Sequence, residues 1–179
     1  MDNPFLAQTL DEDLNDQQSV ESLSDHIEIK EVNQFEVYYN RHMGHYWQAY
    51  KPWIKLFMVP KIGMKLLSKD FTRIGVAHDY PGVTPIPHLR YDACLPKQLF
   101  KLSSDFPRQT LGGGKYVVCS GVRLRNVDLL KQLMLTRWLK DNNLQFRYGP
   151  SISYVKLAKS VTSAFEATQA LIDIAIPIY

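Results

Sequence analysis

The chain has 179 residues, 45% of them hydrophobic, and a formal net charge of +3 at pH 7. This length and composition fit one soluble globular domain, or two small repeats that share one core. The longest apolar runs, such as residues 174–178, are far too short to cross a bilayer, and the N-terminus lacks the basic and apolar segments of a signal peptide. We therefore expect a cytoplasmic protein without membrane contact, in which Cys94 and Cys119 are reduced and buried.

Charge is distributed unevenly along the chain. Residues 1–25 hold seven acidic side chains and no Lys or Arg, whereas the remaining residues hold 21 basic and 11 acidic side chains, a net charge of +10. We expect residues 1–25 to form a disordered acidic arm, because they lack apolar periodicity, and residues 26–179 to form the folded domain. The arm is too short and too acidic for a helix-turn-helix, and the domain has no Lys/Arg run, so we expect no specific nucleic-acid binding.

The domain begins with a predicted strand and helix. Alternating apolar residues predict a strand over residues 26–42, bent near Asn33. From about Tyr46, apolar residues recur at three- and four-residue spacing, which predicts a helix that starts late or kinks at Pro52. Its apolar face comprises Trp47, Tyr50, Trp53, Ile54, Phe57 and Met58.

A break and a hairpin follow. Pro60 and Gly63 predict an interruption after the helix. Residues 73–78 and 88–95 alternate apolar and polar side chains and predict two paired strands. Prolines in the connection fix φ and remove backbone donors, so we expect no helix there; they are Pro81, Pro85 and Pro87.

The second half repeats this order of elements. Residues 109–120 predict a strand that passes through three glycines, Gly112 to Gly114, where we expect the backbone to lie close to a neighbour rather than to bind phosphate. A helix is predicted from Asn126, its N-cap, to Lys140, with Asp128 in its first turn. Two further strands are predicted over residues 151–157 and 171–178.

These elements carry motifs that resemble one family. The segments RIGVAHDYPGVTP and LRYDACLP, the run from Gly112 to Tyr116, Gly121, Trp138-Leu139 and the ending Ile176-Pro177-Ile178 look like the GyrI-like family, the effector-binding domain attached to AraC- and MerR-type regulators. The resemblance covers residues 27–178. It implies an α+β fold of two βαββ repeats, with one antiparallel sheet, helices on one face as in SOUL-like proteins, and a ligand cleft between the repeats.

The candidate binding residues come from this resemblance and from the aromatic content of 12%. Aromatic side chains near the expected cleft are Tyr46, Trp47, Tyr91, Trp138 and Tyr154, although for any one of them a place in the core is the commoner reading. Members that capture cationic drugs or hydrolyse cyclopropane-bearing toxins have a buried glutamate where this chain has Ser153. Because a serine cannot pair with a cation or act as a general acid, the resemblance here implies a ligand that is neutral.

Other chemistry finds little support in the sequence. His42 and His45 lie three residues apart, but Gly44 and the turn between them deny them a common helix face, so we expect no metal and no cofactor. No nucleophile motif is present, and Cys94 is expected to be a small core residue. The sequence therefore predicts a stand-alone bacterial domain that binds a small hydrophobic or aromatic molecule. The alternatives are a DNA gyrase inhibitor that acts by protein–protein interaction and, third, a cyclopropane-toxin hydrolase, which Ser153 disfavours.

Overall fold

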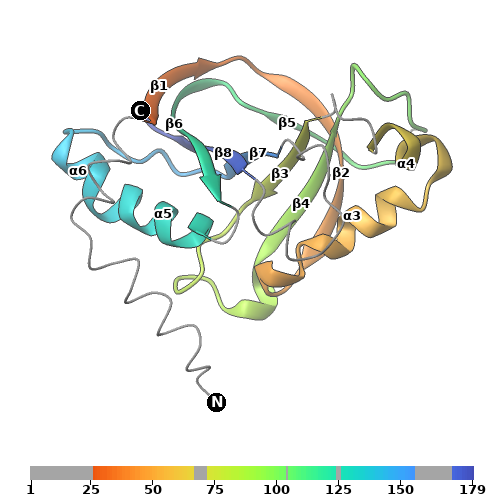
Figure 1. Cartoon of the computed structure of the whole chain (residues 1–179), viewed down its shortest axis with the longest axis horizontal. Helices are drawn as coiled ribbons and strands as arrows, with labels where there is room; N and C mark the ends of the chain where they lie inside the picture. The colour runs from red at the N-terminus through yellow and green to blue at the C-terminus, as the bar shows by residue number, and fades with distance from the viewer. Residues whose placement is uncertain (1–25, 67–71, 104, 124–125, 156–170) are drawn as a thin grey trace.

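A single antiparallel sheet organises the computed structural model, which describes residues 26–66, 72–103, 105–123, 126–155 and 171–179 (Figure 1). Its strand order is β1-β6-β8-β7-β3-β4-β2-β5. The strands are β1 (Ile27–Val32), β2 (Phe35–Met43), β3 (Arg73–Ala77), β4 (Arg90–Pro96), β5 (Arg108–Leu111), β6 (Gly114–Arg123), β7 (Ser151–Val155) and β8 (Leu171–Pro177).

The helices lie in two groups on the two halves of the sheet (Figure 1). The first group holds the 3-10 turn η1 (Tyr46–Gln48), α3 (Tyr50–Phe57) and α4 (Pro60–Leu66). The second holds α5 (Val127–Leu133), the π-helical segment η4 (Met134–Trp138) and α6 (Leu139–Asp141). Among the described residues, no helix has the length and apolar character needed to span a membrane.

Two βαββ repeats build this sheet, so the predicted α+β fold is confirmed. The first is β2, α3 with α4, β3 and β4; the second is β6, the α5–α6 group, β7 and β8. In each repeat the last strand lies between the other two, and β3 pairs with β7 to join the repeats at the middle of the sheet. The acidic arm at residues 1–25 and Leu157, at the end of a predicted strand, fall outside the described residues.

The first strand of each repeat is bent, and the two bends lie against each other. Asn33 separates β1 from β2 as predicted, whereas the strand predicted over residues 109–120 is interrupted and forms β5 and β6. The interruption arises because Gly112 has a φ of +79°, which is not a strand conformation. The two backbones are also very close here, since a Cβ on Gly112 would lie 2.4 Å from the carbonyl oxygen of Asn33. This confirms the predicted close backbone approach. Because β1 pairs with β6 and β2 with β5, each bent strand contacts both halves of the sheet.

The side-chain alternation of the strands separates three core clusters. The α5–α6 group covers one cluster, which includes Val117, Ile174 and Ile176, and α3 with α4 covers another, which includes Tyr38 and Leu95. The strand register puts both clusters on one face of the sheet, as predicted. The third cluster fills the opposite face, with side chains from strands across the whole sheet: Val37, Ile74, Val76, Cys94, Leu111, Tyr116, Val118, Ile152 and Ala175. Each fully buried aliphatic side chain contributes about 1.5–3 kcal/mol of transfer free energy.

Two predictions about prolines are wrong. The predicted interruption at Pro60 and Gly63 is the helix α4, which begins at Pro60 because a proline needs no helical N–H in the first turn. Gly63 lies inside this helix, where only a glycine fits, because a Cβ at this position would lie 2.3 Å from the carbonyl oxygen of Phe57. The β3–β4 connection also contains a 3-10 turn, η2 (Ile86–His88), with Pro87 in its first positions.

The second-repeat helix begins as predicted but continues differently. Asn126 occupies the N-cap position without a capping hydrogen bond from its side chain, and Asp128 lies in the first turn. The π-helical segment η4 widens the middle of the predicted helix. Cys94 and Cys119 are free and buried, as predicted.

Candidate functional site

A strip of small side chains separates the two helix groups on the helix-bearing face. It lies on β3 and β7, the two central strands, and consists of Gly75, Ala77, Ser151 and Ser153. The strand register pairs Gly75 with Ser153 and Ala77 with Ser151. α3 packs on β2 and β4, and α5 packs on β6 and β8, so this inter-repeat strip lies between the two helix groups. Three of its four residues are buried: Gly75, Ala77 and Ser151.

Tyr91 on β4 covers one end of the strip. A Cβ on Gly75 would lie 2.3 Å from the Tyr91 hydroxyl oxygen, so only glycine leaves room for this ring. The indole Nε1–H of Trp53 on α3 donates a hydrogen bond to the same hydroxyl at 3.1 Å. Burial raises the pKa of Tyr91 to about 12, which keeps the phenol protonated.

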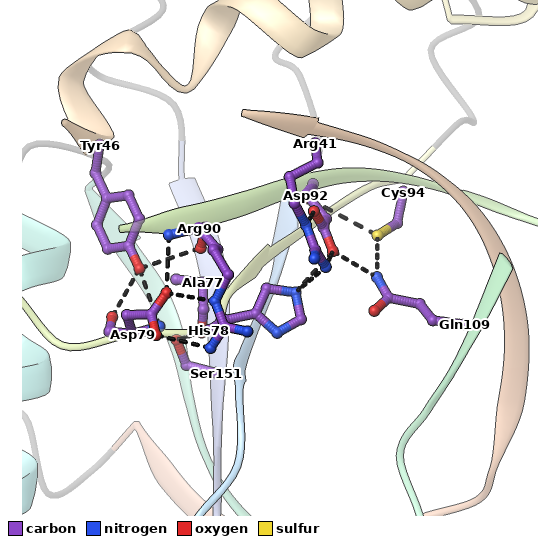
Figure 2. A network of polar contacts seen from close by, with 10 residues as sticks. All are labelled: Arg41, Tyr46, Ala77, His78, Asp79, Arg90, Asp92, Cys94, Gln109 and Ser151. Atoms are coloured by element: carbon purple, nitrogen blue, oxygen red, sulfur yellow. Dashed lines mark hydrogen bonds and ion pairs between the residues drawn. The ribbon is translucent and has the colours of Figure 1, made fainter. Parts of the chain in front are cut away.

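Tyr46 in η1 joins the start of the first helix group to the β3–β4 hairpin (Figure 2). Its hydroxyl donates to the carbonyl oxygen of Asp79 at 2.7 Å, with that of Arg90 also within 3.2 Å, and accepts from the Asp79 N–H. The rings of Tyr46 and Tyr91 pack edge to face, with centroids 6.3 Å apart. Burial raises the pKa of Tyr46 above its usual value. Tyr46 and Tyr91 therefore form one aromatic wall beside the strip.

Ser153 lies on the strip, and its hydroxyl donates a hydrogen bond to the Gly75 carbonyl oxygen at 3.3 Å. Its neighbours Ile152 and Tyr154 pack in the third core cluster, on the opposite face of the sheet. Strand alternation thus separates Ser153 from Tyr154, although both are candidate ligand contacts by sequence.

The remaining candidates lie apart from this wall. Trp47 is 64% exposed and stacks obliquely on His45, whose ring accepts the Trp47 N–H at the start of η1. Trp138 is half-buried against the first core cluster beneath the second helix group. The structure therefore brings together Tyr46, Tyr91 and, through Gly75, Ser153, but not the other three candidates.

Sequence reasoning missed two contributors to this wall. Trp53 appears in the sequence only as part of the apolar helix face, although its N–H binds Tyr91. Gly75 appears as an ordinary strand residue. An isolated glycine inside a strand is a signal of a close approach, and here the approaching group is the Tyr91 ring.

A second polar group lies on the opposite face, and the sequence analysis did not identify it (Figure 2). Asp92 is fully buried, accepts two hydrogen bonds from Arg41 at 2.7 and 2.8 Å, and contacts His78 Nε2 at 2.7 Å. Gln109 donates a further bond at 2.9 Å. Burial alone would raise the pKa of Asp92, but the bonds from Arg41 and His78 outweigh it and hold the pKa below the usual range. The signal in the sequence is the pair of opposite charges at positions 41 and 92, but this pair can be recognised only once the register of the two strands is known.

A cavity of about 560 Å³ lies elsewhere, at the β2–β5 edge of the sheet. Its lining residues are Gln34, Phe35, Glu36, Lys97, Gln98 and Thr110. Five of the six are polar or charged, and none belongs to the aromatic wall. Ligand sites are mostly apolar with a few placed polar groups, whereas these lining residues are mostly polar or charged.

Comparisons with known proteins identify the fold. No protein-family model and no curated protein sequence matches this chain. Among solved structures, the EcmrR C-terminal domain is similar at a TM-score of 0.54 and 16% identity, over 86% of this chain and 96% of that domain. An uncharacterized conserved protein from Listeria innocua reaches a TM-score of 0.59 at 8% identity, over 91% and 97% of the two chains. SAV2435 bound to tetraphenylphosphonium reaches 0.53 at 10% identity, over 86% and 93%.

The fold is that of a GyrI-like domain. At these identities the likeness concerns the backbone, and the functional argument depends on the residues of the strip itself.

Proposed function

We propose that this GyrI-like chain binds a small molecule with an aromatic body at the inter-repeat strip. The observation that carries the proposal is the strip itself: small side chains on the two central strands, between helix groups that stand apart. Beside it stand Tyr46 and Tyr91, whose rings offer a flat apolar contact surface. A ligand on the strip would contact both repeats at once.

The structural neighbours support a small-molecule role. SAV2435 has been solved with tetraphenylphosphonium, an aromatic cation, and the EcmrR domain belongs to a protein also solved in a complex with DNA. The resemblance to the GyrI-like family aligns its buried glutamate with Ser153 of this chain. The Ser153 hydroxyl is half-buried and donates to the Gly75 carbonyl oxygen. The strip therefore differs from a cation site in lacking a carboxylate at this point, which also removes the general acid that a hydrolase would need.

The substitution Ser153→Glu tests the site. A carboxylate beside the Tyr91 ring should raise the affinity for a planar cation such as rhodamine 6G by about tenfold, because a charge-assisted contact in a partly desolvated site is worth about 1.5–3 kcal/mol. Burial raises the pKa of the new carboxylate, so the gain should be present at neutral pH and lost as the pH falls and the group protonates. Dye fluorescence titrations of both proteins at pH 7.5 and pH 5 measure this.

Leu171→Glu is the matched control, because it adds the same charge at a side chain that is 55% exposed on β8. It should leave dye binding within about twofold of the native protein. If Ser153→Glu and the native chain bind the dye equally at both pH values, Ser153 does not lie at the binding site. Co-purification of gyrase subunits with the native chain would instead favour the inhibitor alternative.

A further inference from the structure

Five exposed apolar side chains lie together on η1 and α3, on the outside of the first helix group. They recur at three- and four-residue spacing, so each lies next to the following one along one side of the helix. The sequence predicted one apolar helix face here, but of that set only Trp53 turns towards the core. The exposed residues, called the α3 patch below, are Trp47, Tyr50, Ile54, Phe57 and Met58, and each is 45–76% exposed.

The α3 patch has the character of an interaction surface. Single exposed apolar residues are common on proteins and need no explanation, but contiguous apolar patches with a polar border mark interaction sites. The buried side of α3 is formed by Pro52 and Leu56, so the α3 patch is not needed to hold the helix on the sheet. It is available for a second contact.

The border of the α3 patch is positively charged. Residues 37–69 contain no Asp or Glu, and in the described part of the chain no ion pair includes a lysine of α3 or α4. Lys51 and Lys55 directly follow Tyr50 and Ile54, so they lie beside the α3 patch on the same helix. The exposed lysines of the two helices are Lys51, Lys55, Lys61 and Lys65. A partner for this face should therefore be both apolar and acidic.

Residues 1–25 of the same chain have this chemistry. They carry seven acidic side chains and no Lys or Arg, and their apolar side chains include Phe5, Leu6, Leu10 and Leu14. They directly precede β1, which begins at Ile27. A segment of this length can extend to about 80 Å, whereas a domain of about 150 residues has a radius of gyration of only about 15 Å. The α3 patch is therefore within reach of this segment.

Two other occupants fit the α3 patch less well. In a symmetric dimer the face would meet its own copy, which would place lysines opposite lysines with no acid between them. An anionic membrane would attract the lysines but repel the seven acids of residues 1–25, which are linked to the same domain. Opposite charge and tethering both favour the chain's own acidic segment.

We propose that residues 1–25 bind in cis to the exposed face of η1, α3 and α4, with their apolar side chains on the α3 patch and their carboxylates beside the four lysines. The bound segment removes the α3 patch from water and neutralises the positive charge around it. This inference does not depend on the proposed function, because it uses neither the inter-repeat strip nor the aromatic wall.

Hydroxyl-radical footprinting of the full chain, read by mass spectrometry, measures whether the α3 patch is covered. The native chain is compared with a variant whose segment has lost four of its seven charges. The four substitutions are Asp11→Asn, Glu12→Gln, Asp13→Asn and Asp16→Asn. Trp47 and Met58 should be labelled at least about threefold more slowly in the native chain, because a tethered segment at an effective concentration of about 1 mM stays bound most of the time even when its affinity is weak. Tyr179, 72% exposed in the second repeat, should be labelled equally in both proteins.

Charge reversal on the helix tests the other side of the contact. Lys51→Glu together with Lys55→Glu should raise the labelling of Trp47 and Met58 to the level of the variant with the neutralised segment. The matched control is Lys115→Glu together with Lys140→Glu, which makes the same charge change at two exposed lysines outside the first helix group and should keep the protection. Adding Asp11→Lys and Asp13→Lys to the reversed helix should restore at least part of the protection, which a folding defect could not do.

Three results would overturn the proposal and leave the proposed function intact. Equal labelling of the native chain and the neutralised variant would show that residues 1–25 do not cover the α3 patch. Protection that disappears on dilution would assign the contact to a second copy of the chain. Protection that appears only when phosphatidylserine vesicles are added would assign the α3 patch to a lipid surface.

Discussion

At the scale of single residues, Asp92 is the strongest polar anchor of the sheet. Its carboxylate joins Arg41 on β2, His78 beyond the end of β3 and Gln109 on β5, so one side chain ties three neighbouring parts of the sheet to β4. All its partners donate to it, and no pocket among those described opens beside it. This arrangement is typical of a structural network, because a buried carboxylate is tolerated when its oxygen atoms are fully bonded.

Asp92→Asn should therefore destabilise the protein by about 2–3 kcal/mol at pH 7. The expected loss of stability is smaller than for a fully buried ion pair because the Arg41 side chain is 34% exposed. Since the folded pKa of Asp92 is lowered, its contribution is present above the unfolded pKa of about 3.9 and is lost as the pH falls below it. The difference between variant and native protein in urea unfolding should thus narrow between pH 5 and pH 2.5.

Glu36→Gln serves as the control for Asp92. It breaks the ion pair between Glu36 and Lys97, whose side chains are 54% and 38% exposed. Because both side chains are so exposed, the substitution should change the free energy of unfolding by less than about 1 kcal/mol at any pH. A pH-independent effect of Asp92→Asn would contradict the lowered pKa.

At the scale of elements, the packing of α3 on the sheet depends on a glycine in β3. Gly75→Ala should cost about 1–3 kcal/mol, because the new methyl group would overlap the Tyr91 ring and displace its hydroxyl from Trp53. In a Tyr91→Phe background, where the nearest clashing atom is absent, the same substitution should cost about 1 kcal/mol less. Gly149→Ala, whose Cβ would meet only an ordinary contact at 3.4 Å, should be close to neutral. Additive effects in the double variant would place Tyr91 away from Gly75.

Element order was predictable from the sequence, and element boundaries at prolines were not. Alternating side chains predicted β3 and β4 to within two residues because the pattern is local, although both faces of these strands are buried in the structure. The predictions at Pro60 and Pro87 failed because a proline can either end one element or start the next, and the residues around it decide which of the two occurs. The π-helical segment η4 has no signature in the helical periodicity that surrounds it.

The ligand-binding role of the candidate residues stays a prediction, and the structure shows only which of them lie together. The sequence named Tyr46 and Tyr91, whose rings are in contact. Alternation alone could not say which face of β7 meets the helices. That choice depends on the pairing of β7 with β8 and with β3, and the β3 partners lie more than seventy residues away in the sequence.

At the scale of the whole molecule, the two repeats are joined twice. The β3–β7 pairing joins them at the centre, and the bent strands join them again, since β1 pairs with β6 and β2 with β5. The second connection passes through a point where two backbones nearly touch: the Gly113 N–H donates to the Val32 carbonyl oxygen at 2.8 Å, next to the contact between Gly112 and Asn33. Closure of the sheet at its outer strands therefore depends on a residue without a side chain.

Gly112→Ala should be among the most damaging substitutions in the chain, with an expected loss of at least about 3 kcal/mol in urea unfolding. Two costs combine there: a φ of +79° that L side chains rarely adopt, and a backbone oxygen atom only 2.4 Å from the new Cβ, which cannot move aside as a flexible side chain could. Gly82→Ala separates them, because Gly82 has a φ of +91° but no atom within 4 Å of a Cβ, so it should lose only about 1–2 kcal/mol. Hydrogen exchange should show faster opening of β1 and β5 in the Gly112 variant, while β3 and β7 remain protected, because the central pairing does not use this contact. Equal losses for the two alanine variants would mean that backbone conformation alone, and not the crossing of the bent strands, requires a glycine at position 112.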